Sequence, residues 1–596
     1  MEEDIIQGGS FLIEDIRPDQ VFTPEDFDEE QRLVAKSTEE FAQGEVLPKA
    51  DELEELNYDL IRSLMRRAGE LGLLSADIPE VYGGSGLDKV SSTLITEKMT
   101  AGGTSFMVTF ADHTGIGSLP IVLFGSPKQK EKYLPKLASG EYIGAYALTE
   151  SEHGSDALRC KATATPSKDG KYFTLNGQKQ FITNAGFADL FLTYAQVGGE
   201  RFTGFIVERA FDGVSLDEEE KKMGIHGTST RGVIFEDVKV PVENVLGEIG
   251  RGHVVALNTL NIGRFKLGGG CLGAAKAMLA EAVRYAKQRV QFGKPIAEFG
   301  LIKHKIAEMA LRIYVTESML YRTAGLIDLI LHGIDPTAED AGQKTAQGVR
   351  EYATECSINK VYGSEMLDYV VDEAVQILGG YGYIQEYLPE RVYRDSRINR
   401  IWEGTNEINR MLVLDMLMRK AMKGDLPLLP AIQKLTSEFM SYTPSLMESE
   451  DATLGAQRKL VEMAKKIGLM AAGISTQKYM DKLRDEQEII ALIADMVIEI
   501  FAMESAVLRT LKKVEKSGEE EAKIHLAATK VYIDEAFPRV ELLARQVLGA
   551  VSQGDELRTQ LSGLKKFTRY TPINSVSLRR EIADSVIAVS RYHLSP

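Results

Sequence analysis

The feature that most constrains the fold is a change of hydrophobic period inside a chain that is otherwise helical in pattern. Between about residues 146 and 247, short apolar stretches are bounded by turns. Lys161–Thr165 and Tyr172–Leu175 flank the turn Lys168-Asp-Gly-Lys171, which predicts a hairpin because Asp-Gly tolerates the positive φ of tight turns. We therefore expect a small antiparallel β-barrel or sandwich in this block.

Helical periodicity lies on both sides of this block. Before it, the apolar residues from Leu53 to Met65 recur near the 3.6-residue period, and Gly and Pro separate the segments. After Pro241, long apolar-periodic segments predict a helical bundle. These segments are Lys276–Val290, Lys303–Leu331, Ala346–Val361 and Val371–Leu378.

The predicted fold class is therefore α+β and mostly α, with four domains. We expect an N-terminal helical domain over residues 1–145 and a middle antiparallel β-barrel domain over 146–247. A helical bundle follows over 248–420, and an additional C-terminal helical domain over 421–596 begins with a Pro-containing linker. A chain of 596 residues is long enough to bury several cores.

Composition excludes several classes of function. The formal net charge of −17 argues against nucleic acid as a partner, because a polyanion would be repelled. The three cysteines are far apart and the eight histidines form no HExxH motif, so neither a disulfide framework nor a metal site is expected. A reducing compartment fits best, and we expect a cytoplasmic protein.

Neither a targeting signal nor a membrane crossing is expected. The first residues, Met1–Ile6, are acidic where a signal or transit peptide would be basic. The most apolar window, Ile489–Leu508, contains three acids at near-helical spacing. This pattern predicts a buried helix with one solvent-exposed edge.

The strongest candidate for chemistry is Glu403, which follows the only tryptophan of the chain, Trp402, and precedes a glycine. A carboxylate wedged beside an indole, with no adjacent Lys or Arg, is expected to have its pKa raised by desolvation above about 4.3. Glu403 would then be a usable base near neutral pH. The alternative is a surface carboxylate at a loop-to-helix junction, with Trp402 as a core anchor.

Four further polar and glycine-rich segments are candidates for ligand binding, and each has a structural alternative. Tyr146–Asp156 could bond a polar ring edge or a phosphate, or cap a helix. Gln180–Asn184 ends a strand, and Arg289–Gly293 ends a helix, where the arginine could serve the helix dipole. Gln376–Gly382 contains three glycines in four positions, which lets backbone amides approach a phosphate. Gly268–Gly273 matches GxGxxG, but no strand precedes it, so a Rossmann site is not expected.

Together, in this order and spacing, these motifs resemble the acyl-CoA dehydrogenase family of flavoproteins over about residues 30–420. The segments Tyr82–Gly86, Gln129–Gly140, Lys222–Arg231 and Leu260–Arg264 are also similar to the family. The extra C-terminal block resembles the very-long-chain branch. The resemblance implies an N-terminal helical domain, a middle β-domain and a helical bundle, with FAD extended between the last two and across a subunit contact.

The resemblance also implies roles for individual residues. The flavin would be lined by Tyr146, Leu148, Thr149, Ser155, Phe181, Ile182 and Thr183, with Phe181 stacked on the ring where many relatives have Trp. The pyrophosphate and adenosine would be held by Arg289, Phe292, Gln376, Gly379 and Gly380, partly from the neighbouring subunit, and Thr405 and Asn406 would complete the FAD site. The acyl-CoA would contact Ser155, Asn261, Arg264 and Gly404.

The implied reaction is α,β-dehydrogenation of an acyl-CoA to the trans-2-enoyl-CoA in fatty acid β-oxidation, with Glu403 removing the α-proton and flavin N5 accepting the hydride. Some branches carry the base beside the arginine that corresponds to Arg264, but this chain has Gly263 there, so Glu403 has no rival. Asn261, where shorter-chain relatives have an acid, favours long acyl chains. The implied partners are an electron-transfer flavoprotein and a second copy of the chain, as a homodimer or homotetramer.

Two alternatives and one additional hypothesis remain open at this point. The chain could be an acyl-CoA oxidase that uses oxygen, or an assembly or scaffold protein on the same fold. In the C-terminal block, Arg458, Lys459, Lys465 and Lys466 interleave with apolar residues from Leu460 to Met470. This pattern is typical of an interfacial helix, so peripheral membrane contact through the C-terminal domain is one hypothesis.

Overall fold

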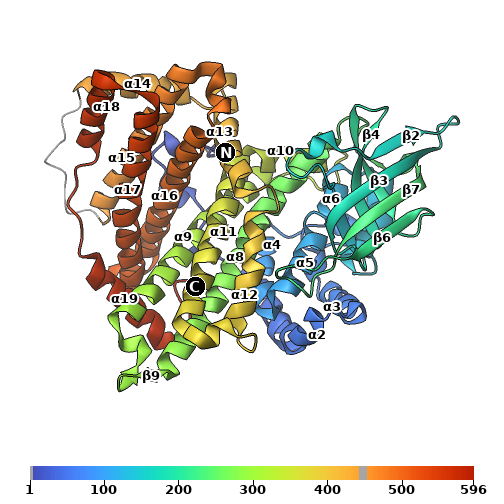
Figure 1. The fold of residues 1–596 in the computed structure, drawn as a ribbon, viewed down its shortest axis with the longest axis horizontal. Coiled ribbons are helices and arrows are strands. Elements are labelled where there is room, and N and C mark those ends of the chain that lie inside the picture. Colours follow the sequence, from blue (N-terminus) through green and yellow to red (C-terminus); the bar gives the residue numbers. More distant parts are fainter. Residues whose placement is uncertain (1–4, 442–452, 596) are drawn as a thin grey trace.

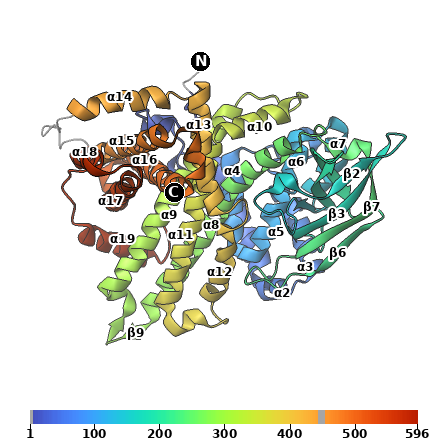
Figure 2. The same ribbon diagram turned by 45° about the horizontal axis from the view of Figure 1, so that its top comes forward.

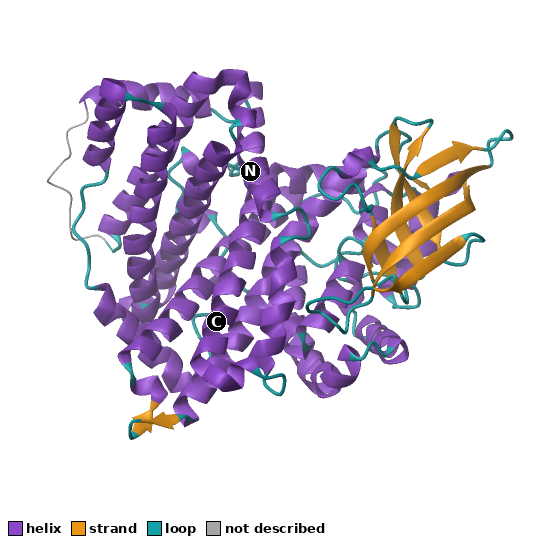
Figure 3. Cartoon of the chain, viewed as in Figure 1, coloured by secondary structure: helices purple, strands orange, loops and turns teal. Residues whose placement is uncertain are grey.

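Helices form most of the molecule, and one sheet lies at one end of it. A computed structural model describes residues 5–441 and 453–595. Apart from a short hairpin at the far end, the strands of the described residues gather in a single block, and helices fill the rest (Figure 3). The predicted order of a helical domain, a β-domain and further helical domains is therefore confirmed.

The N-terminal helical domain contains α1–α7. Helices α1–α5 share a core that includes Phe41, Leu64 and Met65, and α6 and α7 pack into the larger core of the molecule. The helices are α1 (Glu29–Phe41), α2 (Ala50–Glu54), α3 (Tyr58–Glu70), α4 (Lys89–Met99), α5 (Thr104–Thr114), α6 (Leu119–Phe124) and α7 (Pro127–Ala138). Helix α1 begins at Asp28, whose side chain accepts from the Gln31 amide at 2.8 Å, while the Gln31 side chain accepts from the Asp28 amide. This reciprocal capping box fixes the start of the helix.

The residues before α1 lie against the later domains instead. The Gly9 amide donates to Glu355 at 2.7 Å, and the ring of Phe11 packs against Phe501 with centroids 4.8 Å apart. Glu25 accepts from Arg509 at 3.0 Å. The first segment of the chain therefore ties the helical bundle to the C-terminal domain.

The middle domain is one sheet with the strand order β6-β7-β3-β2-β4-β5-β8, and β1 also pairs with β4. The strands are β1 (Gly144–Ala147), β2 (Thr163–Pro166), β3 (Tyr172–Thr183), β4 (Leu190–Val197), β5 (Arg201–Glu208), β6 (Val214–Glu219), β7 (Thr230–Pro241) and β8 (Val245–Leu246). The predicted hairpin is the antiparallel pair β2–β3, in which Thr163 lies opposite Asn176.

The expectation of a closed antiparallel barrel is wrong in two respects. The strands at the two ends of the sheet, β6 and β8, do not pair with each other, so the sheet is open. Strands β1 and β2 both run parallel to β4. The edge strand β6 carries Asp217, Glu218 and Glu219, and a charged edge disfavours pairing with another strand.

The helical bundle follows the sheet and is built on α8, a helix of 37 residues. Its helices are α8 (Gly252–Gln288), α9 (Gly300–Leu331), α10 (Ala341–Glu351), α11 (Ala353–Leu378), α12 (Leu388–Ser396) and α13 (Asn406–Lys423). A hairpin of β9 (Val290–Gln291) and β10 (Lys294–Pro295) joins α8 to α9. Gly268–Gly273 lies inside helix α8, whereas a Rossmann fingerprint would lie between a strand and a helix. The two segments predicted over Ala346–Val361 and Val371–Leu378 belong mostly to one helix, α11.

The C-terminal domain is a second layer of helices that packs mainly against α9 and α13 (Figures 1 and 2). It contains α14 (Leu428–Ser441), α15 (Gly455–Tyr479), α16 (Gln487–Glu521), α17 (Lys523–Val551), α18 (Gly554–Phe567) and α19 (Ser575–Val589). Buried ion pairs join the two layers: Arg509 bonds Glu317 at 2.7 Å, and Arg322 bonds Glu504 at 2.7 Å. Buried pairs of this kind demand good geometry, so they fix how the layers dock.

Two predictions about membranes can be compared with this packing. The window Ile489–Leu508 is a buried part of α16, as expected. Among the described residues, Thr104–Phe124 is long and apolar enough to cross a membrane by length and composition, and 78% of that window is buried in the protein. On α15, Leu460, Val461 and Ile467 are buried, so the apolar face proposed for a membrane packs inside the domain instead.

Candidate active site

Glu403 lies in a strained loop between the short helix Arg397–Arg400 and α13. Its φ is +57°, and that of Gly404 is +77°. A left-handed conformation costs a non-glycine residue about 1–2 kcal/mol, so the surroundings must hold it. Thr405 then caps α13 by accepting from the Ile408 amide at 3.2 Å.

The Glu403 carboxylate lies against the backbone of α8 at Gly263. A Cβ atom at Gly263 would be 2.7 Å from Oε2 of Glu403, closer than any ordinary contact. Only glycine therefore leaves room for the carboxylate. The sequence analysis identified Gly263 only as a residue that cannot act as a base.

Burial raises the pKa of Glu403 to about 7, although the positive charges of Arg264 and Lys360 oppose this shift. Oε2 is shielded from solvent and has no hydrogen-bond partner among the described residues. The predicted direction of the shift is therefore confirmed. Trp402 donates from Nε1 to Asn399 at 3.1 Å, and the backbone of α8 at Gly263 lies in close contact with the carboxylate.

Two buried side chains hold the loop by its carbonyl groups. Arg264, which is 4% exposed, donates from Nε to the Glu403 carbonyl at 3.1 Å and from Nη1 to Asn261 at 3.1 Å. Asn409 donates to the carbonyls of Gly404 at 2.8 Å and Thr405 at 3.0 Å. The Glu403 amide, in contrast, donates to no described residue. The loop thus presents a free N–H and a carboxylate oxygen together.

Other titratable groups surround the carboxylate. Tyr146 is buried and its hydroxyl has no partner among the described residues, and burial keeps the pKa of this phenol well above its usual value. Asp112 on α5 is also buried, and burial, followed by the charge of Glu403, raises its pKa well above the usual value. Asn184 donates to Asp112 at 3.2 Å. Asp112 was not identified from the sequence, because Gly115 and Gly117 after it indicated only a break between helices.

The two predicted segments of the β-domain meet beside this site. The Gln180 amide donates to the Thr149 carbonyl at 2.9 Å, which joins the end of β1 to the end of β3. Leu148 and Ile182 are buried below, whereas Phe181 is 61% exposed at φ +60°. Thr183 is half-buried, and Ser155 is exposed in the loop after β1. An uncovered aromatic ring held at a strained backbone position is suited to stacking on a planar ring.

The third group of predicted residues lies elsewhere in the molecule. A pocket of about 470 Å³ at the end of α8 is lined by Arg289, Gly379 and Gly380, and Gln376 lies one turn before it on α11. Phe292, at the tip of the β9–β10 hairpin, is 94% exposed. A Cβ atom at Gly379 or Gly380 would meet nothing within 4 Å, so a ligand can approach this backbone.

Within a single chain, the residues implied to hold FAD form two separate groups, and the resemblance places one group partly on a neighbouring subunit. Gly263 beside Glu403 and Gln288 beside Arg289 are 25 residues apart on the same helix, which corresponds to about 37 Å. The hairpin labelled β9 lies at the far end of the bundle from the sheet (Figure 1). The Tyr146 and Gln376 segments form two separate sites of one chain.

Four parts of the chain match models of known protein families. Residues 28–141 match the description "Acyl-CoA dehydrogenase, N-terminal domain", residues 145–238 match "middle domain", and residues 250–418 and 463–566 each match "C-terminal domain". A mostly helical chain with one sheet and a buried carboxylate beside an exposed aromatic thus corresponds to one class of flavin-dependent oxidoreductase. The chain belongs to the acyl-CoA dehydrogenase family, as its motifs indicated.

Three relatives illustrate the likeness. A "Probable acyl-CoA dehydrogenase" of Bacillus subtilis is 51% identical over 591 residues, covering 99% of both chains. The crystal structure of an acyl-CoA dehydrogenase complexed with FAD from Bacillus anthracis has a TM-score of 0.97 and 53% identity, covering 99% of this chain and 100% of that one. A very long-chain specific acyl-CoA dehydrogenase of Rattus norvegicus is 42% identical over 61% of this chain and 54% of its own.

Proposed function

We propose that this protein is an FAD-dependent dehydrogenase of long-chain acyl-CoA thioesters that acts in fatty acid β-oxidation, with Glu403 as the base. The observation that carries the proposal is the Glu403 carboxylate, which has a shielded, unpartnered Oε2 and a pKa of about 7. A base with this pKa is half ionised near neutral pH and can accept a proton there.

The residues of the site support each part of the chemistry. Glu403 takes the α-proton, and its free amide N–H is available to the thioester carbonyl, on which negative charge develops. FAD, when bound, supplies the acceptor for the hydride from the β-carbon. Phe181 and the Tyr146–Thr149 segment would hold the flavin ring, and Gly263 keeps the carboxylate free of any side chain on α8.

The finer parts of the proposal have different supports. The long-chain preference is supported by Asn261 and by relatives named very long-chain specific. The open pocket at Arg289 and Gly380 supports a homodimer or homotetramer, in which a second copy brings this pocket to the flavin site. An electron-transfer flavoprotein as the acceptor and a cytoplasmic location follow from the family resemblance and the composition, and remain proposals.

The test is the replacement Glu403→Gln, which removes the base and keeps the size of the side chain. We expect this variant to retain FAD and to lose at least about 10²- to 10⁴-fold in flavin reduction, the range typical of a general base. The measurement is anaerobic bleaching of flavin absorbance on addition of a saturated C16 acyl-CoA. Glu407→Gln, in an exposed acid of the same segment, is the matched control. A Glu403→Gln variant with full activity would remove Glu403 from the mechanism.

A further inference from the structure

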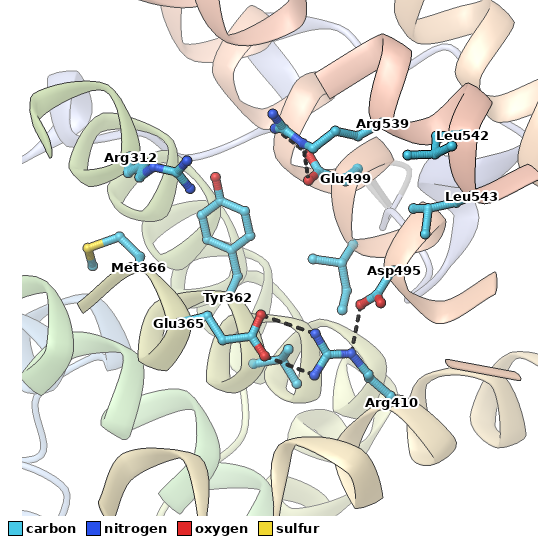
Figure 4. A pocket seen from close by; sticks show the side chains of 12 residues that line it. Arg312, Tyr362, Glu365, Met366, Arg410, Asp495, Glu499, Arg539, Leu542 and Leu543 are labelled. Atoms are coloured by element: carbon cyan, nitrogen blue, oxygen red, sulfur yellow. Dashed lines mark hydrogen bonds and ion pairs between the residues drawn. The ribbon is translucent and has the colours of Figure 1, made fainter. Parts of the chain in front are cut away.

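A chain of hydrogen bonds crosses the junction between the helical bundle and the C-terminal domain. It lies along a pocket of about 350 Å³ formed by α9, α11 and α13 on one side and by α16 and α17 on the other (Figure 4). Arg410 of α13 donates from Nε to Asp495 of α16 at 2.7 Å. Its two terminal nitrogens donate to the two oxygens of Glu365 on α11, at 2.9 and 3.1 Å. This two-point fork holds the guanidinium plane in one orientation.

The chain continues from Glu365 to the loop that carries Glu403. Asn406, which is 3% exposed, donates from Nδ2 to Glu365 at 3.0 Å. Its Oδ1 accepts from Lys360 at 2.6 Å. Because a buried amide with partners at both ends has no freedom to rotate, Asn406 is fixed in place. Asn406 is the first residue of α13 and stands three positions after Glu403.

The loop itself depends on this first turn of α13. Glu403 and Gly404 both have positive φ, and the carbonyls of the loop are held by Asn409. Asn409 and Arg410 lie one turn after Asn406 on the same helix, so a rotation of the start of α13 would move all three side chains. The geometry of the base therefore depends on partners of α13 that lie in another domain.

We propose that Arg410 is a positioning residue through which the docked C-terminal domain, by way of Asp495, fixes the loop that carries Glu403. Arg410 acts through Glu365 and Asn406: it donates to Glu365, and Asn406 donates to the same carboxylate. The C-terminal domain is then part of the apparatus that orders the base. This inference rests on the proposed role of Glu403 for its kinetic consequences only.

The same pocket contains a matched control. Arg539 of α17 also makes a two-point contact, at 2.9 and 3.2 Å, with Glu499 of α16. Glu499 in turn accepts from Tyr532, which is bonded to Tyr362 of α11. None of these bonds leads to Asn406. Arg539→Gln thus removes an arginine of similar geometry from the same pocket without interrupting the chain to Glu403.

The experiment compares full-length holoenzymes carrying Asp495→Ala, Asp495→Asn and Arg539→Gln. With a saturated C16 acyl-CoA and an artificial electron acceptor, we expect kcat of Asp495→Ala to fall by about tenfold or more, the scale of a displaced catalytic group. KM should change little, because none of the hydrogen bonds from Asp495 to Asn406 involves the substrate. Asp495→Asn, which retains an acceptor for Arg410, should recover part of the rate, and Arg539→Gln should retain the full kcat.

Hydrogen exchange gives a second readout that needs no substrate. We expect peptides covering residues 398–409 to exchange faster in Asp495→Ala than in the wild type or in Arg539→Gln. Arg410→Lys keeps the positive charge and loses the two-point contact with Glu365, so it should show the same two changes. It replaces Asp495→Ala in the experiment if that variant does not fold. An Asp495→Ala protein with wild-type kcat and wild-type exchange would overturn the inference. If the wild type oxidises no acyl-CoA, the proposed function fails, and the exchange result still decides the inference.

Discussion

The two ends of helix α8 carry sites of opposite character. Near Gly263 the side chains are packed and bonded, with Arg264 only 4% exposed and the Glu403 Oε2 shielded from solvent. Near Gln288 the surface is open, with Phe292 94% exposed and a pocket of about 470 Å³ lined by Arg289 and Gly380. One chain therefore surrounds the base with its own residues, whereas the other end of α8 stays open to solvent.

The largest difference between the two ends should follow from filling the space at Gly263. In Gly263→Ala the new Cβ would lie 2.7 Å from Oε2 of Glu403, so the carboxylate must move. We expect kcat to fall by about 100-fold, the effect of a shift of about 1 Å at a catalytic group, with FAD still bound. Steady-state kinetics and the flavin spectrum measure both quantities.

The control for this substitution is Gly549→Ala on α17, where a Cβ atom would meet nothing within 4 Å. It should leave kcat unchanged. Equal kcat in Gly263→Ala and the wild type would show that α8 does not confine the base.

A smaller effect is expected at the open end of α8. Phe292→Ser removes the apolar tip of the β9–β10 hairpin, which we expect to be among the minority of interface residues whose truncation costs more than about 1 kcal/mol. We expect the proposed oligomer to dissociate at protein concentrations at least about fivefold higher and to lose FAD on dilution. Light scattering and flavin content measure this, while kcat per bound FAD stays the same.

Val576→Ser on α19, another exposed apolar position, is the control and should change neither quantity. If Phe292→Ser remains as associated and as rich in FAD as the wild type, the open end is not an interface.

The smallest effect concerns the charge of Arg264. This charge lowers the pKa of Glu403, so Arg264→Gln should raise that pKa further, by about one unit or more. Since Glu403 must be ionised to accept a proton, the acidic limb of the pH–rate profile should move to higher pH. Arg264→Lys should restore the limb in part, and the exposed Arg284→Gln of the same helix should not move it. If the acidic limb does not move in Arg264→Gln, the charge of Arg264 does not influence the pKa of Glu403.

Much of the fold was predictable because its signals are local. The change of period at residues 146–247 and the Asp-Gly turn at 169–170 depend only on neighbours in sequence, and both were predicted correctly. The closure of the sheet was not, since it depends on whether β6 and β8 meet in space. Helix α11 was split in the prediction, because Gly363, Ser364, Glu365 and Asp368 interrupt the apolar period between the two predicted segments.

The site shows the same limit. Glu403 was identified from its own segment, together with the motifs of the family. Asp112 was not identified, and Gly263 was noted only because it cannot act as a base, since both residues interact with a loop more than 100 residues away in the chain. The bonds of Arg410 to Glu365 and Asp495 likewise join three helices far apart in sequence. Charge pattern alone shows such residues as ordinary surface charges.

The most direct test is the pH dependence of flavin reduction in a single anaerobic turnover with a saturated C16 acyl-CoA. The ionisation of Glu403 predicts a rate that rises with pH through about 7 and then levels, and a residual rate without this limb in Glu403→Gln. A wild-type rate that is flat between about pH 5 and 9, or the same limb in Glu403→Gln, would contradict the assignment of the base.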